Sequence, residues 1–157
     1  MIRVQREDFD PGAELATLTA GNKAVGGVVS FVGLVRDMAA GQPIRAMSLE
    51  HYPGMTEKKL AEIEAEARTR WPIEASLIVH RYGRLEPGER IVLVIVASSH
   101  RQAAFEACAF LVDWLKTQAP FWKEEETASG GSHWVEAKTE DDEATARWRK
   151  RPNEAAE

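Results

Sequence analysis

Residues 90–118 read RIVLVIVASSHRQAAFEACAFLVDWLKTQ and contain the two strongest structural signals in the chain. The run 90–97 is almost wholly apolar, which predicts a strand buried on both faces at the centre of a sheet. Either Ser98 or Ser99 can cap the helix that follows, and apolar residues recur at helical spacing as far as Gln118. The pattern therefore predicts a central strand that leads directly into a long helix packed on the sheet.

Weaker patterns on either side predict further helices and strands. A second amphipathic helix is expected over 56–71, and a short one from Pro11 to Ala20 with Asp10 as its N-cap. Residues 38–43 are expected to form a mobile loop. Further strands are expected at 2–6, 24–36, 44–52, 73–82, 121–125 and 132–137. Because helices and strands are mixed without strict alternation, the predicted class is α+β.

The composition fits one domain and excludes several classes of function. The chain has 157 residues, 44% of them hydrophobic, enough for a core without disulfides. All of the net charge of −5 lies after Lys123, and a neutral body argues against a nucleic-acid-binding protein. No apolar run could span a membrane. We expect one domain over 1–138 and a charged, mobile tail over 139–157.

Histidine and cysteine residues are predicted to be structural. Cys108 is the only cysteine, which excludes an intramolecular disulfide and indicates a reducing, cytoplasmic location. It lies on the apolar stripe of the long helix and is expected to be a small core residue. His51 and His80 are expected to be hydrogen-bonded core or boundary residues, and no residue cluster has the spacing of a metal site.

Cationic side chains occur at three places where a ligand could bind. His100 and Arg101 begin the long helix, where free N–H groups and the helix dipole attract anions. Lys116 and Lys123 flank the end of that helix, where other cations and aromatic rings can lower the pKa of an amine. Arg36 ends a strand beside the expected loop. Taken singly, each has an ordinary structural alternative, such as a solvated first turn, a helix-end charge or a strand-end ion pair.

Six blocks of sequence carry a resemblance to a known family. They are Phe31–Asp37, Leu49–Met55, Val79–Gly83, Ser99–Arg101, Phe105–Ala107, and Leu115–Lys116 with Pro120–Lys123. In this order and spacing they resemble the molybdopterin synthase catalytic (large) subunit, from about residue 2 to Trp148. The resemblance implies an α/β-hammerhead type of α+β domain, with a mixed, mainly antiparallel sheet and two main helices. It also implies a homodimer in which each protomer binds a small ubiquitin-like sulfur-carrier subunit, giving a heterotetramer.

The family's reaction converts cyclic pyranopterin monophosphate into molybdopterin, a step in molybdenum cofactor biosynthesis. Two sulfurs come from the C-terminal thiocarboxylate of the small subunit, so this chain needs no sulfur, metal or cofactor of its own. The resemblance places these residues around the substrate: Leu34, Val35, Arg36, His100, Arg101, Lys116, Lys123, Glu124 and Glu125. Lys116 and Lys123 are the expected catalytic residues of this sulfurtransferase.

We expect a division of work among these side chains. Arg36, His100 and Arg101 would hold the phosphate and the pterin. Lys116 would meet the partner's C-terminal group and stabilise an oxyanion, and Lys123 would act as general acid or base. Because Leu34 and Glu124 stand where a basic residue is common in the family, this pocket has fewer cations.

Two other functions would give a role to only some of these residues. A non-catalytic adaptor would grip the tail of a ubiquitin-like protein and use the cations only for its terminal carboxylate. A regulatory domain that binds a phosphate ester or nucleotide would use the helix start and leave Lys116 and Lys123 without a role. Formation of the dithiolene product distinguishes the enzyme from both.

Overall fold

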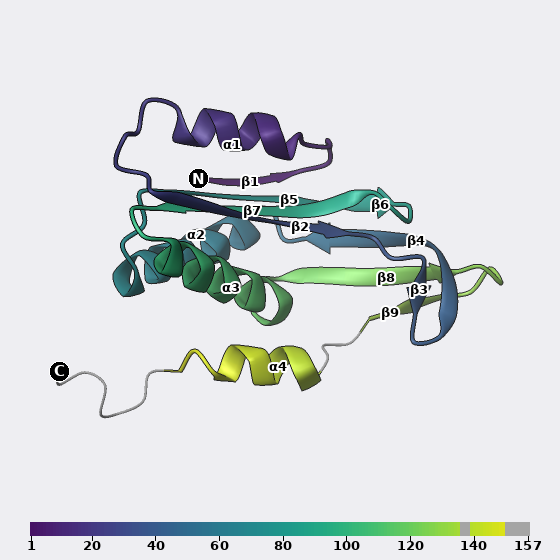
Figure 1. The fold of residues 1–157 in the computed structure, drawn as a ribbon. Helices are drawn as coiled ribbons and strands as arrows, with labels where there is room; N and C mark the ends of the chain where they lie inside the picture. The colour runs from purple at the N-terminus through teal and green to yellow at the C-terminus, as the bar shows by residue number, and fades with distance from the viewer. Residues whose placement is uncertain (136–138, 150–157) are drawn as a thin grey trace.

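The computed structural model describes residues 1–135 and 139–149 (Figure 1). Its strands are β1 (Ile2–Gln5), β2 (Gly27–Leu34), β3 (Met38–Ala39), β4 (Gln42–His51), β5 (Ala75–Arg81), β6 (Gly83–Leu85), β7 (Arg90–Ser98), β8 (Phe121–Thr127) and β9 (Ser132–Trp134). Its helices are α1 (Pro11–Thr19), α2 (Met55–Arg70), α3 (Arg101–Thr117) and α4 (Thr139–Ala146). The predicted α+β class, with two main helices, is confirmed.

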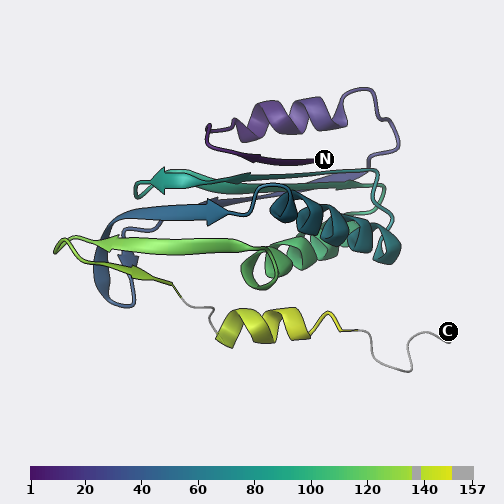
Figure 2. The same ribbon diagram turned by 180° about the vertical axis from the view of Figure 1, so that it is seen from behind.

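Strand β7 lies inside a four-stranded sheet of order β1-β5-β7-β2. It pairs antiparallel with β2 and β5, whereas β1 is parallel to β5, so the sheet is mixed. Residues Val92, Val94 and Val96 pack against α2 and α3, and residues Leu93 and Ile95 pack on the opposite side with α1. Helices therefore cover both faces of the sheet (Figures 1 and 2), which explains why β7 is apolar throughout.

A second, antiparallel sheet has the order β3-β4-β8-β9, with β6 also paired to β4. The expected mobile loop over 38–43 is wrong, because β3 and the start of β4 form a tight hairpin there. Ala40 and Gly41 both have positive φ, 49° and 76°, at the tip. Strand β6 also has no counterpart in the predicted strands, since its three residues carry no periodic signal.

The start of α3 differs from its expected cap. Helix α3 begins at Arg101 with His100 as the N-cap residue, and no side chain caps it. The hydroxyl of Ser98 instead donates to the carbonyl of Pro72 at 2.6 Å, because β7 continues through Ser98. Gly26 lies against this junction, where a Cβ atom would come 2.2 Å from the carbonyl oxygen of Ser99. A side chain at this position would therefore collide with the backbone at the start of α3.

Residues 139–149 differ from the expected mobile tail, because Thr139–Ala146 form α4 and the chain packs against α3. The Trp148 ring lies 5.5 Å from Trp71 in an edge-on arrangement. Its Nε1–H donates to the Asp113 carboxylate at 2.6 Å. One tryptophan thus anchors a helix that has no buried residue of its own, which is why apolar periodicity gave no sign of it. Residues 150–157 of the predicted tail, and 136–137 of the last predicted strand, lie outside the described residues.

Candidate active site

A cavity of about 320 Å³ lies where the two sheets, the end of α3 and the start of α4 meet. Its volume falls in the range of small-ligand sites. Three cations line it: Arg36 after β2, Lys116 in the last turn of α3, and Lys123 on β8. Three carboxylates also line it: Glu125, Glu140 and Asp141. The cavity thus offers both charge types to one ligand.

Two of these cations are available to a ligand. Within residues 1–135 and 139–149, the side chains of Arg36 and Lys116 make no hydrogen bond or ion pair. Arg36 therefore has no strand-end ion pair with Asp37, which was its structural alternative. Lys123 alternates with the exposed Trp122 along β8, so its side chain faces the cavity.

Glu125 is the buried carboxylate of the site. It is 6% exposed and lies on the cavity face of β8, two residues from Lys123. Its Oε2 is 3.4 Å from Nε2 of His133 on β9. The neighbouring Glu124 does not line the cavity, because adjacent residues of a strand point to opposite faces.

The remaining predicted residues divide into those at the cavity and those away from it. Leu34 lines the cavity, whereas the side chain of Val35 is buried with Leu49 and does not. His100 and Arg101 lie at the opposite end of α3 from Lys116. A helical rise of 1.5 Å per residue puts Arg101 about 22 Å from Lys116 along the axis. A single chain therefore does not bring these two groups of predicted residues together.

Sequence reasoning missed the contribution of α4. Glu140 and Asp141, in its acidic first turn, line the cavity beside Thr117 at the end of α3. The hydroxyls of Thr117 and Thr145 are 2.8 Å apart, which holds α4 against this wall. The only sequence signal was Trp148, a large aromatic residue in an otherwise charged segment.

His80 lies beneath the cavity. Its ring stacks on Phe121, a lining residue, with centroids 3.8 Å apart. Burial lowers the pKa of His80 from 6.5 to about 3, and the charges of Lys123 and Lys116 act in the same direction. The imidazole is therefore neutral at physiological pH, and the expected core role of His80 is confirmed.

We predict that this histidine makes the protein less stable in acid. Below pH 6.5 the unfolded chain binds a proton that the folded protein does not bind until about pH 3. The free energy of unfolding should fall by up to about 1.4 kcal/mol per pH unit in this range, and not above it. Urea denaturation between pH 7.5 and 4.5 should show a shallower fall for His80→Phe than for the wild type. Equal slopes for wild type and His80→Phe would contradict the prediction.

Cys108 has no part in the site. It is 3% exposed, and burial raises the pKa of its thiol to about 11. The thiol is thus protonated at neutral pH and is neither a nucleophile nor a sulfur carrier. The predicted core role is confirmed. In the part of the chain that the structure describes, no group of three His, Cys, Asp or Glu residues could hold a metal ion.

Comparison with known proteins identifies the family. The family described as MoaE protein matches residues 4–118, most of the chain. The chain belongs to the MoaE protein family. The match includes the strand end at Arg36 and the end of α3 at Lys116. The family predicted from the six sequence blocks is therefore confirmed.

Individual members of the MoaE family agree with this match. The molybdopterin synthase catalytic subunit of Pseudomonas aeruginosa is 58% identical over 147 residues, which cover 94% of this chain and 97% of that protein. The solved MoaE protein of Burkholderia ambifaria is 53% identical, with a TM-score of 0.80 over 94% of this chain and 97% of that one. A complex of subunits 1 and 2 of molybdopterin-converting factor from Helicobacter pylori shares the fold at 20% identity, with a TM-score of 0.69 over 88% of this chain and 90% of that one.

Membership of the MoaE family confirms the predicted enzyme class. As a member of this family, the chain is a molybdopterin synthase catalytic subunit, and it acts in molybdenum cofactor biosynthesis. None of the described helices has the length and apolar character needed to cross a membrane.

Proposed function

We propose that this chain catalyses the conversion of cyclic pyranopterin monophosphate into molybdopterin, with two sulfurs from the C-terminal thiocarboxylate of a small ubiquitin-like subunit. The observation that carries the proposal is the convergence of Arg36, Lys116 and Lys123 in one cavity of a MoaE-family chain. An adaptor needs a cation only for a terminal carboxylate. A cavity with three cations and three carboxylates suits a larger, polar substrate as well.

The two charge types of the cavity suit the two ends of this substrate. The guanidinium of Arg36 can bind phosphate oxygens through two parallel hydrogen bonds. Glu125, with Glu140 and Asp141 of α4, can accept hydrogen bonds from the amino and ring N–H groups of a pterin. Substrate binding therefore uses the cation and the carboxylates at the same time.

Lys116 and Lys123 are placed for the sulfur transfer. The thiocarboxylate sulfur attacks a side-chain carbon that carries an oxygen of the cyclic phosphate. A C–S bond forms as that C–O bond breaks, and the released oxygen stays on the phosphorus as part of an opened phosphate monoester. The product is an acyl–sulfur intermediate that joins the two molecules. Water then attacks the acyl carbon, the acyl–sulfur bond breaks, and the sulfur stays on the pterin while the small subunit leaves with a carboxylate. The ammonium of Lys116 stabilises the oxyanion of this step, and Lys123 transfers protons during sulfur addition and ring opening. The second sulfur comes from a second small subunit and adds to the adjacent side-chain carbon, which is at the carbonyl level. The oxygen of that carbon leaves as water, and hydrolysis of the second acyl–sulfur bond completes the dithiolene.

The separation of α3's two ends supports a homodimer with a shared site. Arg101 and Lys116 lie about 22 Å apart along one helix, too far to touch one pterin phosphate. We propose that His100 and Arg101 enter the cavity of a second protomer, so that each site is built from both chains. With one small subunit at each site, the assembly is a heterotetramer.

The thiol chemistry supports a proposal for the cellular location. Cys108 is a free thiol, which is usual in a reducing compartment. We therefore propose a cytoplasmic protein that acts without a metal or cofactor of its own.

Reconstitution tests the proposed reaction. The chain is mixed with cyclic pyranopterin monophosphate and a thiocarboxylated small subunit, and the dithiolene product is followed by its fluorescence after oxidation. We expect product that depends on all three components, and no product when the small subunit ends in an ordinary carboxylate. Small-subunit binding without product would favour the adaptor, and binding of the pterin phosphate without product or partner would favour the regulatory domain.

A further inference from the structure

The backbone before Arg36 is held by a turn that is distant in sequence. The N–H of Val35 donates to the carbonyl of Glu89 at 2.9 Å, and the carbonyl of Val35 accepts from the N–H of Gly88 at 2.8 Å. Leu34, which lines the cavity, is paired with Arg90 in the β2–β7 register. The turn 86–89 therefore sets the course of the chain as it leaves β2 and enters the cavity wall.

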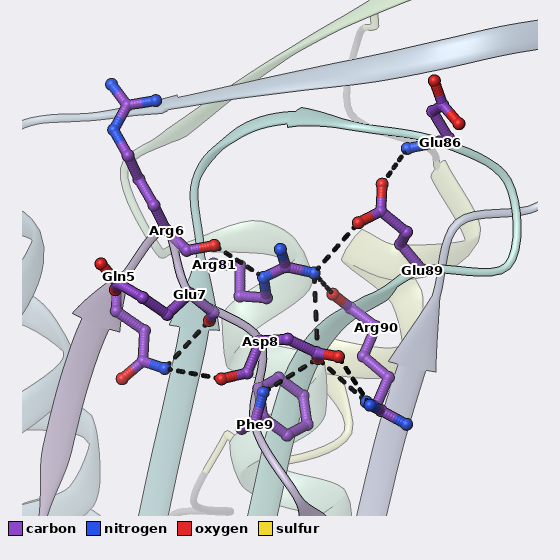
Figure 3. A network of polar contacts seen from close by, with 9 residues as sticks. All are labelled: Gln5, Arg6, Glu7, Asp8, Phe9, Arg81, Glu86, Glu89 and Arg90. Atoms are coloured by element: carbon purple, nitrogen blue, oxygen red, sulfur yellow. Dashed lines mark hydrogen bonds and ion pairs between the residues drawn. The ribbon is translucent and has the colours of Figure 1, made fainter.

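The same turn is held from below by a buried guanidinium, Arg81, which is 8% exposed (Figure 3). Its Nε–H donates to the carbonyl of Arg6 and its Nη1–H to the carbonyl of Arg90, both at 2.9 Å. Its Nη1 is also 3.6 Å from the carboxylate of Glu89 and 3.9 Å from that of Asp8. Arg81 thus joins the end of β1, the turn 86–89 and the start of β7.

Glu89 belongs both to this network and to the turn 86–89 itself. Its Oε2 accepts from the N–H of Glu86 at 2.5 Å, which closes the turn on itself. Its Oε1 faces Arg81 at 3.6 Å, and its backbone carbonyl holds Val35. One residue therefore connects the buried guanidinium to the segment that carries Arg36.

Asp8 and Arg90 complete the network on the solvent side. Two hydrogen bonds of 2.9 and 2.6 Å join the Arg90 guanidinium to the Asp8 carboxylate. This contact lowers the pKa of the Asp8 carboxyl, so that the pair is ionised at neutral pH. The ionised Asp8 carboxylate thus lies beside the Arg81 guanidinium.

We propose that Arg81 and Glu89 are positioning residues for Arg36, acting through the turn 86–89 and the two backbone hydrogen bonds of Val35. The inference rests on the proposed function, in which Arg36 binds the substrate phosphate. The side chain of Arg36 makes no hydrogen bond or ion pair among the described residues, so the course of its backbone sets how it enters the cavity. A buried cation costs desolvation energy, and two of the contacts of Arg81, with the carboxylate of Glu89 and the carbonyl of Arg90, lie on the segment that leads into the cavity wall at Ile91.

Steady-state kinetics of three variants tests this role, with thiocarboxylated small subunit at saturation. For Arg36→Ala we expect the KM for cyclic pyranopterin monophosphate to rise about tenfold or more with little change in kcat. The reason is that the lost contact with the phosphate is equally strong in the bound substrate and in the transition state. For Glu89→Ala we expect KM to rise roughly three- to tenfold, again with little change in kcat. The double variant should be no worse than Arg36→Ala alone, because both changes remove one interaction.

A matched control separates positioning from stability. Glu62→Ala removes another exposed carboxylate paired with a cation, Lys59 on α2, and should leave KM at the wild-type value. Thermal melts should show that all variants are folded at the assay temperature. A Glu89→Ala variant with wild-type KM, or a double variant whose effects multiply, would overturn the positioning role alone. A wild-type KM for Arg36→Ala would overturn the proposed role of Arg36, and the positioning role with it.

Discussion

Replacement of Lys116 by alanine is expected to slow single-turnover sulfur transfer by about 10²- to 10³-fold, the usual cost of losing one oxyanion-stabilising group. Lys116 lines the cavity from the last turn of α3 and has no partner among the described residues, so its ammonium is free to meet the thiocarboxylate. Binding of the small subunit should change little, because most of that interface lies outside one side chain. Rapid-quench measurement of product, with binding measured separately by calorimetry, gives both values.

Two further variants make the Lys116 result specific. Lys123→Ala should also lose about 10²-fold or more if Lys123 transfers a proton in the reaction. Lys58→Ala removes an exposed lysine of α2, away from the cavity, and should react at the wild-type rate. Wild-type rates in both Lys116→Ala and Lys123→Ala would refute the catalytic assignment.

Mixing two inactive variants should restore activity if each site is shared between protomers. In a heterodimer of Lys116→Ala and Arg101→Ala chains, one site combines the intact Lys116 of one protomer with the intact Arg101 of the other. The second site carries both substitutions. Random exchange between equal amounts of the two homodimers should recover on the order of a quarter of the wild-type activity, because half of the dimers have one intact site.

The controls for this complementation follow from the same geometry. Lys116→Ala mixed with Lys123→Ala should stay inactive, because both residues line the same cavity of one chain and no heterodimer contains an intact site. Exchange between protomers is verified by native mass spectrometry. No recovery in an exchanged mixture of Lys116→Ala and Arg101→Ala would show that His100 and Arg101 do not enter the partner's cavity.

Part of the candidate site could be predicted because its residues lie on or beside helices and strands that the sequence pattern indicates. Arg36 follows β2, Lys116 lies in the last turn of α3 and Lys123 lies on β8, and one cavity brings the three together. Glu124 could not be separated from Glu125 without the register of β8, since one position of shift exchanges the two faces of a strand. The cap of α3 was wrong because Ser98 contacts Pro72, a residue far away in the chain.

The sequence by itself determined the α+β class, the central strand β7, the two main helices and the family. These features depend on apolar periodicity and on motifs contained in short segments, which a single chain displays directly. Only the tertiary structure decided that α4 walls the cavity, that Arg81 contacts the turn 86–89, which holds Val35, and that His100 and Arg101 lie far from Lys116. The physical reason is that these relations depend on contacts between residues distant in sequence, such as Trp148 with Trp71, which no local pattern encodes.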